Sequence, residues 1–574
     1  MELFPKYSVP VVVILLILGC FNFTYAKLPV ISAEDFVKCS ELPENQRRKI
    51  LSPTEIVSTN NGKVQGYIQT VCGRDVETFY GIPYATPPTG NLRFRKPEKV
   101  ENWTNILNAT MKPYSCFQLN DSSFNSHRGV TMWNHDTPIS EDCLYLNIFT
   151  PSRKRIISVL FWIFGGSYNS GTSTLDVYDG TILAGLFDIV VVTINYRLGP
   201  LGFAYLGTEE IPGNMGLLDQ QLALSWVNEN IKYFGGGESM VTIFGESAGA
   251  SSVAFHLLNS KSITYFQYAI LQSASATAEW AYKSPDLMLS RTKKVADCAG
   301  CKQEDLSKLA ACLRKSNTNI LTGCQFIDVG NVLFMNITFT PTLDYHKFLP
   351  DEPFQLLESG QFKKSNVLAG VTKNEGNYFF LYEVDPSLYE KGDYLEKANV
   401  TKAVFSKYIS QILSPTQSDR CTIDLLTETF YLSYLFNYSH SQPTTLQYIS
   451  VVDQITGDLQ FKCPVKTLAD AYSRAGIPVY IYSFEHRTKY NPWPTWMGVL
   501  HGYEIEFVFG YPLLNANYTV DEKLLSHKMM TAWTNFANTG YASASQISRI
   551  RPRESPRPRN FPDYQIFMIF RVIF

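Results

Sequence analysis

The chain has 574 residues, of which 45% are hydrophobic and 14% aromatic, and its 50 basic and 52 acidic side chains nearly cancel. This length is too great for an ordinary single domain, but it suits a large α/β enzyme with insertions and a substantial core. The balanced charge excludes the strongly basic or acidic character of a chain that binds nucleic acid or a polyanion.

Residues 1–26 have the pattern of a secretory signal peptide. Lys6 precedes an apolar stretch at 9–21, and the small residue Ala26 follows where cleavage is expected. The stretch is short for a membrane span, with a signal anchor as the alternative. We therefore expect a secreted, extracellular mature chain with no membrane span. Its ten cysteines after residue 26 can form disulfides, and its seven Asn-x-Ser/Thr sites fit a glycoprotein.

Strand-like and helix-like stretches alternate along the chain. This alternation predicts an α/β fold with a large, mostly parallel central sheet flanked by helices. Buried strands are expected at 158–164, 189–195, 241–244, 365–371 and 478–484, and an amphipathic helix at 217–233. We find no internal repeat and no convincing linker before residue 540, which favours one large domain over 27–540.

A Gly-x-Ser-x-Gly motif occupies residues 245–249, between the strand at 241–244 and a helical stretch. This is the pattern of a nucleophile elbow, which exposes its serine at the top of the sheet. A side chain at either glycine would collide with the neighbouring strand or helix. The motif also arises by chance in turns of small residues, but its flanking elements predict that Ser247 is a nucleophile.

Serine attacks a carbonyl only when a base takes its proton and a third group orients that base. His501 is the one histidine of eight in a loop after a late strand with glycines on both sides. Glu375 follows the strand at 365–371 in a polar turn. The chain order serine, acid, histidine is that of α/β-hydrolases. Taken singly, His501 would be a turn histidine and Glu375 a solvated glutamate.

Acyl transfer also needs backbone N–H donors for the oxyanion. One donor should be Ala248, directly after the nucleophile. Others should come from a glycine-rich loop after an earlier strand, and the loop at 165–167 fits, with Gly166 and Ser167 as donors. The alternative is an ordinary Gly-Gly turn.

Several ordered motifs now identify a resemblance. Across roughly residues 60 to 540 the chain resembles the cholinesterases of the type-B carboxylesterase family. The resemblance rests on the segments 79–85, 140–147, 195–199, 244–249 and 496–507. It implies an α/β-hydrolase with the triad Ser247, Glu375 and His501 at the base of a deep gorge, and it implies no metal and no cofactor.

The resemblance also implies a choline site. Cholinesterases hold a quaternary ammonium against a tryptophan face by cation–π attraction. Trp133, ten residues before Cys143, lies in the matching register; the alternative is a loop aromatic packed for stability. Tyr178 and Tyr378 would lie nearby, and Glu246 would add negative field, although simple esterases also carry a glutamate there.

At the gorge mouth, the resemblance places Asp121 as an acidic residue and Tyr382 as a peripheral aromatic. The acyl pocket would be formed by Trp280, Phe379 and the segment at 335–339. Acetyl-selective members usually have two bulky aromatics in that segment, where this chain has Met335 and Ile337. One methylene is worth about 1–3 kcal/mol in an apolar pocket, so we expect propionyl and butyryl esters to be tolerated.

Ser167 departs from the family pattern, which has a third glycine there. The N–H survives, but the added Cβ restricts the backbone, and we expect modest impairment at most.

Two disulfides match family loops, Cys116–Cys143 and Cys301–Cys312. Cys463 matches a family cysteine whose usual partner lies near the C-terminus, where this chain has none. Spacing alone does not assign partners to the remaining cysteines.

After residue 540 the resemblance ends. Residues 541–574 combine interleaved arginines and prolines with a short apolar end, and we expect an irregular, divergent tail.

The leading hypothesis is a secreted serine hydrolase that cleaves choline esters, for example acetylcholine to choline and acetate at a synapse. Its partner is then a small choline ester, and no oligomeric state is predicted. The first alternative is a general carboxylesterase for uncharged esters. The second is a non-catalytic adhesion protein like neuroligin, which lacks the nucleophile; the intact Ser247, Glu375 and His501 argue against it.

Overall fold

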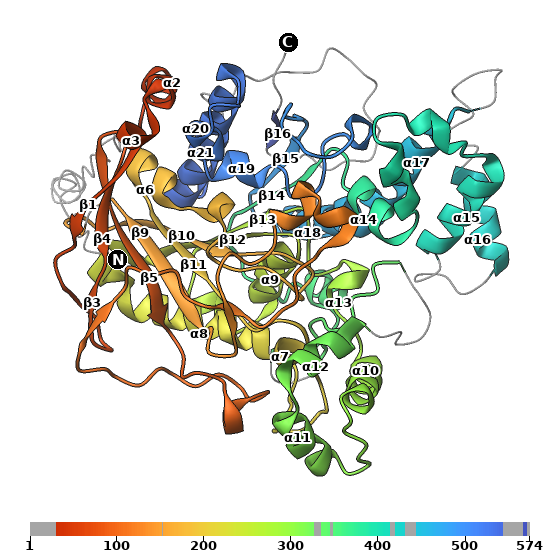
Figure 1. Ribbon diagram of the computed structural model, residues 1–574, viewed down its shortest axis with the longest axis horizontal. Helices are drawn as coiled ribbons and strands as arrows, with labels where there is room; N and C mark the ends of the chain where they lie inside the picture. Colours follow the sequence, from red (N-terminus) through yellow and green to blue (C-terminus); the bar gives the residue numbers. More distant parts are fainter. Residues whose placement is uncertain are drawn as a thin grey trace, which may run out of the picture.

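The structure is a computed structural model that describes residues 30–151, 153–326, 334–344, 348–413, 420–430, 443–542 and 566–570. The predicted signal peptide and most of the predicted tail lie outside these residues. A central sheet with helices on both sides dominates the molecule (Figure 1).

The central sheet has 11 strands, of which the first pairs are antiparallel and the rest parallel. In spatial order they are β1 (Arg48–Pro53), β4 (Tyr67–Val71), β5 (Arg74–Pro83), β9 (Tyr145–Thr150), β11 (Val190–Ile194), β10 (Ile157–Ile163), β12 (Gly236–Glu246), β13 (Tyr268–Gln272), β14 (Val367–Thr372), β15 (Val479–Phe484) and β16 (Ile566–Phe570). All pairs from β11 onward are parallel. The predicted α/β fold is therefore confirmed.

Two small sheets lie outside the main one. They consist of β2 (Val57–Ser58), β3 (Lys63–Gln65) and β6 (Ile106–Asn108), and of β7 (Ser115–Cys116) and β8 (Ile139–Ser140).

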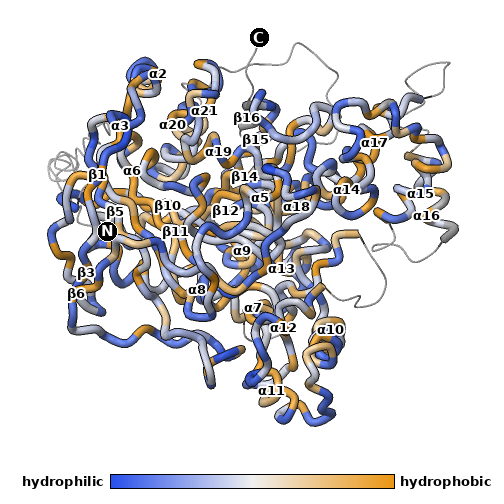
Figure 2. Tube along the Cα trace, in the orientation of Figure 1, coloured by the Kyte–Doolittle hydropathy of each residue, from blue (hydrophilic) through white to orange (hydrophobic). Residues whose placement is uncertain are grey.

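The helices cover both faces of the sheet. In Figure 1, α6 (Thr181–Phe187), α19 (Ile505–Val508) and α21 (Val520–Thr539) lie on one side, and α8 (Met215–Asn230) and α9 (Ala248–Leu258) lie on the other. Strands β10 and β11 are buried along their whole length, as expected for parallel strands covered on both faces. Figure 2 shows the hydrophobic residues concentrated in these central strands.

The remaining helices pack on the sheet or on other helices. They are α2 (Ala33–Glu41), α3 (Glu44–Arg47), α4 (Ser123–Ser126), α5 (Arg128–Thr131), α7 (Gly199–Phe203), α10 (Pro285–Cys298), α11 (Leu306–Lys315), α12 (Thr318–Gly323), α13 (Pro353–Glu358), α14 (Gly376–Glu383), α15 (Lys402–Leu413), α16 (Arg420–Phe430), α17 (Thr445–Gly457), α18 (Cys463–Arg474) and α20 (Tyr511–Leu514). Within the described ranges, none of the helices has the length and apolar character needed to cross a bilayer.

The end of the chain differs from the sequence-based expectation at five residues. Where we expected irregular structure, Ile566–Phe570 forms β16 and pairs in parallel with β15. An apolar five-residue run has no local signal that says which edge it will join, because strand pairing is set by distant residues.

Four disulfides join cysteines in the part of the chain that the structure describes. Cys116–Cys143 and Cys301–Cys312 are the two that the resemblance implied, and Cys39–Cys72 and Cys298–Cys324 are pairings that spacing left open. Cys463 is exposed and has no disulfide partner among the described cysteines.

Candidate active site

Ser247 lies in the sharp turn between β12 and α9. Its backbone has φ 55° and ψ −123°, a conformation that costs a non-glycine residue about 1–3 kcal/mol. The close packing explains both glycines of the motif. A Cβ on Gly249 would lie 2.0 Å from the Ile163 carbonyl oxygen, and one on Gly245 would lie 2.6 Å from the same atom. The turn can therefore form only with glycine at both positions.

His501 and Glu375 form the predicted pair. Glu375 Oε2 lies 2.7 Å from His501 Nδ1, while Glu375 Oε1 accepts hydrogen bonds from the Thr372 N–H and the Ser273 hydroxyl, both at 2.7 Å. Glu375 is fully buried and His501 is 8% exposed. Three hydrogen bonds thus fix the carboxylate, and the carboxylate fixes the imidazole so that Nε2 faces away from it.

A second glutamate, Glu246, faces the other ring nitrogen. Its Oε1 lies 3.1 Å from His501 Nε2, and neither atom has a hydrogen-bond partner in the described structure. Burial lowers the pKa of His501, but the charges of Glu246 and Glu375 outweigh it and raise this pKa above its usual value. Burial also raises the pKa of the Glu246 carboxyl. Both shifts favour the protonated forms of these two groups.

Three backbone amides beside Ser247 have no hydrogen-bond acceptor among the described residues. In the described part of the chain, no hydrogen bond engages the N–H of Gly166, Ser167 or Ala248. Gly166 has φ 107° and Ser167 φ 55°, which turns the loop after β10 toward the nucleophile. A Cβ on the preceding Gly165 would lie 2.9 Å from Ser247 Cβ, so loop and serine are in close contact. This arrangement supports the predicted oxyanion donors.

The motif at 195–199 holds this loop at both ends. The Tyr196 hydroxyl donates to the Phe164 carbonyl at 2.8 Å, and the Gly199 N–H donates to the Tyr168 carbonyl at 2.7 Å. Within the motif, Arg197 forms a buried ion pair with Asp219. The motif is therefore a scaffold for the oxyanion loop.

Ser247 and His501 open into a cavity of about 720 Å³. Trp133, Tyr178, Tyr378, Tyr382 and Phe379 form its aromatic wall. The Trp133 ring packs edge-on against the Tyr503 ring at 6.1 Å, which leaves Trp133 lining the cavity. The residues expected at the choline site and at the gorge mouth all line this cavity, and so do Gly166 and Ser167 of the oxyanion loop.

Asp121 is connected to the aromatic wall by hydrogen bonds. Tyr382 donates to Asp121 Oδ2 at 3.2 Å, and Tyr378 donates to Tyr382 at 3.4 Å. Asn134, next to Trp133, holds the Asp121 backbone through bonds of 2.8 and 2.9 Å. Asp121 at the cavity mouth and Trp133 are therefore joined through Asn134 within one loop.

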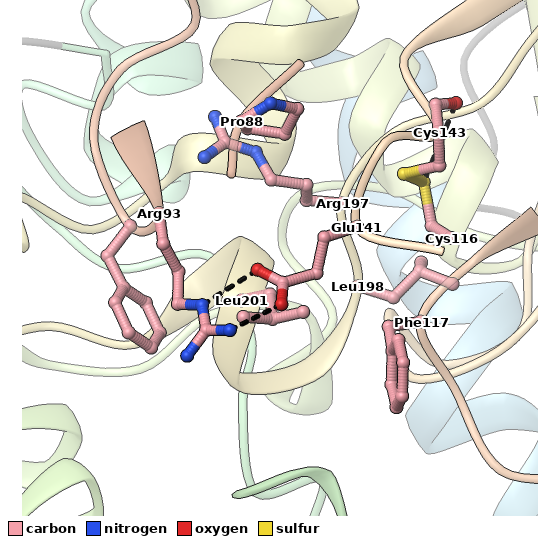
Figure 3. Close-up of a pocket in the computed structure, with 10 residues that line it drawn as sticks. Pro88, Arg93, Cys116, Phe117, Glu141, Cys143, Arg197, Leu198 and Leu201 are labelled. Atoms are coloured by element: carbon pink, nitrogen blue, oxygen red, sulfur yellow. Dashed lines mark hydrogen bonds and ion pairs between the residues drawn. A yellow bond between two sulfur atoms is a disulfide. The ribbon is translucent and has the colours of Figure 1, made fainter. Parts of the chain in front are cut away.

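The Cys116–Cys143 disulfide closes this loop. Figure 3 shows the disulfide near a two-bond ion pair between Arg93 and Glu141. Glu141 belongs to the segment at 140–147, so this motif anchors the base of the loop.

The acyl-pocket residues are placed at different depths. Phe379 lines the cavity, stacks on Phe461 at 5.0 Å and meets the His501 ring edge-on at 5.0 Å. Trp280 is buried behind Phe461, with ring centres 6.0 Å apart. Met335 and Ile337 are buried and do not line the described cavity. Their acyl-pocket role stays a prediction.

Sequence reasoning missed three side chains at this site. Phe461 lies 4.6 Å from the His501 ring, and buried Glu504 adds a carboxylate whose pKa burial raises to about 7. Glu383 lines the cavity four residues after Phe379, one helical turn along α14. That i, i+4 spacing was a usable signal for Glu383. Among the described residues, no group of three His, Cys, Asp or Glu side chains could hold a metal ion.

Comparison with known proteins agrees with this geometry. Residues 53–565 match the model of the carboxylesterase family. The chain is 41% identical to a cholinesterase of Mus musculus over 86% of this chain and 80% of that protein. It is 41% identical to an acetylcholinesterase of Bungarus fasciatus, over 84% and 78% of the two chains. It is 39% identical to acetylcholinesterase 1 of Caenorhabditis elegans, over 82% and 76%.

Proposed function

The chain belongs to the carboxylesterase family, and we propose that it is a serine esterase that hydrolyses choline esters through an acyl-enzyme. Relatives named cholinesterase and acetylcholinesterase, at about 40% identity over most of the chain, support this activity.

One observation carries the choice of a cationic substrate. The acidic residues that line the described cavity are Asp121, Glu246 and Glu383, no Lys or Arg lines it, and a cation inside it would favour their ionised forms. A cavity lined by charges of one sign concentrates counter-ions inside it. Trp133 supplies an aromatic face against which a quaternary ammonium can rest.

In the proposed reaction, the Ser247 hydroxyl attacks the ester carbonyl while His501 Nε2 takes its proton. Glu375 stabilises the imidazolium, and the N–H groups of Gly166, Ser167 and Ala248 would hold the oxyanion. The bond between the carbonyl carbon and the choline oxygen breaks, and His501 gives its proton to that oxygen.

Deacylation reverses the roles. Water attacks the acyl carbon and gives a proton to His501, the bond to Ser247 Oγ breaks, and Ser247 recovers the proton as the acid leaves. The buried Glu246 beside Nε2 would stabilise the positive charge that forms on His501 in both steps.

The test compares acetylthiocholine with its uncharged carbon isostere, 3,3-dimethylbutyl thioacetate, and with phenyl acetate. We expect a preference for the cationic ester of about tenfold or more in kcat/KM, lost in Trp133→Ala and partly kept in Trp133→Phe. Ser247→Ala is the inactive control. Equal rates for the cation and its isostere would instead make the protein a general carboxylesterase.

The adhesion alternative is separated by covalent labelling. An organophosphate should label the protein one to one at Ser247, and no label would appear on a non-catalytic member of the fold. Secretion is part of the proposal, because the four disulfides suit an oxidising compartment. Recovery of the protein from culture medium, cleaved after Ala26, would test it.

A further inference from the structure

Glu383 has a carboxylate on the wall of the cavity, and the proposed reaction assigns no role to it. It is the last residue of α14 and lies on the same helix face as Phe379, one turn earlier. Its side chain is exposed and lines the cavity, where desolvation by the surrounding residues raises its pKa.

The Glu383 carboxylate holds a backbone amide of the acyl-pocket segment. Its Oε2 accepts a hydrogen bond from the Met335 N–H. Met335 has φ 53°, and the Ile337 N–H donates to the Met335 carbonyl at 2.9 Å, so residues 335–337 form a tight turn.

The other side of this turn is held by a cation. Arg291, on α10, donates to the carbonyls of Ile337 and Thr338 at 2.6 and 3.2 Å and to the Asn336 side chain. Arg291 is 3% exposed. The Glu383 carboxylate thus accepts from an N–H group of the turn, and the Arg291 guanidinium donates to its carbonyl groups.

The position of Glu383 is unfavourable without this contact. A negative charge at a helix C-terminus opposes the helix dipole. Among the described residues, the hydrogen bond from the Met335 N–H is the one polar contact of the Glu383 side chain. The Met335 amide is therefore the interaction that this carboxylate is placed to make.

We propose that Glu383 is a positioning residue for acyl selectivity, which fixes the turn at 335–337 by holding the Met335 amide. The inference rests on the proposed ester hydrolysis and on the predicted acyl-pocket role of Met335 and Ile337. It acts through the turn and does not touch the reacting atoms.

The kinetic test measures the butyryl-to-acetyl ratio of kcat/KM in two series, thiocholine esters and phenyl esters. Glu383→Ala removes the acceptor and should change the ratio about fivefold or more in both series, because the turn that carries Met335 and Ile337 is released. Glu383→Gln keeps an acceptor oxygen and should stay within about twofold of the wild type. Glu390→Ala, at an exposed glutamate, is the control.

The two series separate this inference from the proposed function. If the wild type shows no choline preference but Glu383→Ala changes the phenyl ester ratio, the choline proposal fails and the role of Glu383 stands. If Glu383→Gln shifts the ratio as much as Glu383→Ala, the charge itself acts and the positioning role is wrong.

Hydrogen exchange tests the contact without any catalysis. Peptides that contain the Met335 amide should exchange about tenfold faster in Glu383→Ala and at the wild-type rate in Glu383→Gln. Equal exchange in wild type and Glu383→Ala would overturn the inference whatever the kinetics show.

Discussion

Replacing Ser167 by glycine tests how the oxyanion loop tolerates its unusual serine. Ser167 has φ 55°, a left-handed conformation that costs an L-residue about 1–2 kcal/mol. Glycine removes this strain, but its greater loss of conformational entropy on folding costs about 0.5–1 kcal/mol. The free energy of unfolding should therefore rise by about 0–1.5 kcal/mol.

The rate should change little, because the serine already has the backbone that glycine would adopt and its N–H has no partner in the described structure. We expect kcat/KM of Ser167→Gly within about threefold of the wild type, whereas restoring a lost oxyanion donor would give roughly a hundredfold or more. The assay is hydrolysis of acetylthiocholine with active sites titrated by an organophosphate.

The matched control makes the opposite change two residues earlier. In Gly165→Ser the new Cβ would lie 2.6 Å from the Glu246 carbonyl oxygen and 2.9 Å from Ser247 Cβ, so the nucleophile must move. A shift near 1 Å costs about a hundredfold in rate. A hundredfold gain in Ser167→Gly, or full activity in Gly165→Ser, would refute this account of the loop.

Three further predictions follow from the site and its scaffold. Glu246→Gln removes a charge that raises the pKa of His501, so this pKa falls and the neutral base is present at lower pH. The acid limb of the kcat/KM–pH profile should therefore move down by about one pH unit or more. An acid limb that does not move would argue against the contact between Glu246 and His501 Nε2. Asp219→Ala leaves the buried Arg197 without its carboxylate and should lower the free energy of unfolding by about 3–5 kcal/mol in urea titrations, against little change for the exposed Asp351→Ala. Butyrylthiocholine should be hydrolysed within about tenfold of the acetyl ester, and a steady loss with each added carbon would contradict the acyl-pocket assignment.

The parts of this protein that the sequence predicts are those with local patterns. The elbow around Ser247 could be located because a strand, two glycines and a helix follow one another within a few residues. The strands at the centre of the sheet were predicted within a few residues, since parallel strands buried on both faces are continuous apolar runs.

Features that depend on distant residues were not predictable in the same way. Strand β16 joins β15 across about 80 residues of chain, and its five apolar residues carry no sign of that partner. The proximity of Glu246 to His501 Nε2 and of Glu383 to the Met335 amide arises only when separate elements meet. Pairs of this kind require the tertiary structure.

Helix α14 links the two ends of the cavity in one rigid element. Its eight residues span about 12 Å. Asp453 holds its first turn by accepting from the Gly376 and Asn377 N–H groups, directly after the acid that orients His501, and Tyr382 stands near its far end at the cavity mouth. A ligand that binds at the mouth and tilts α14 will displace Glu375 as well. Inhibitors that never reach Ser247 should therefore reduce turnover of bound substrate, with a noncompetitive component that simple blockage of the entrance would not produce.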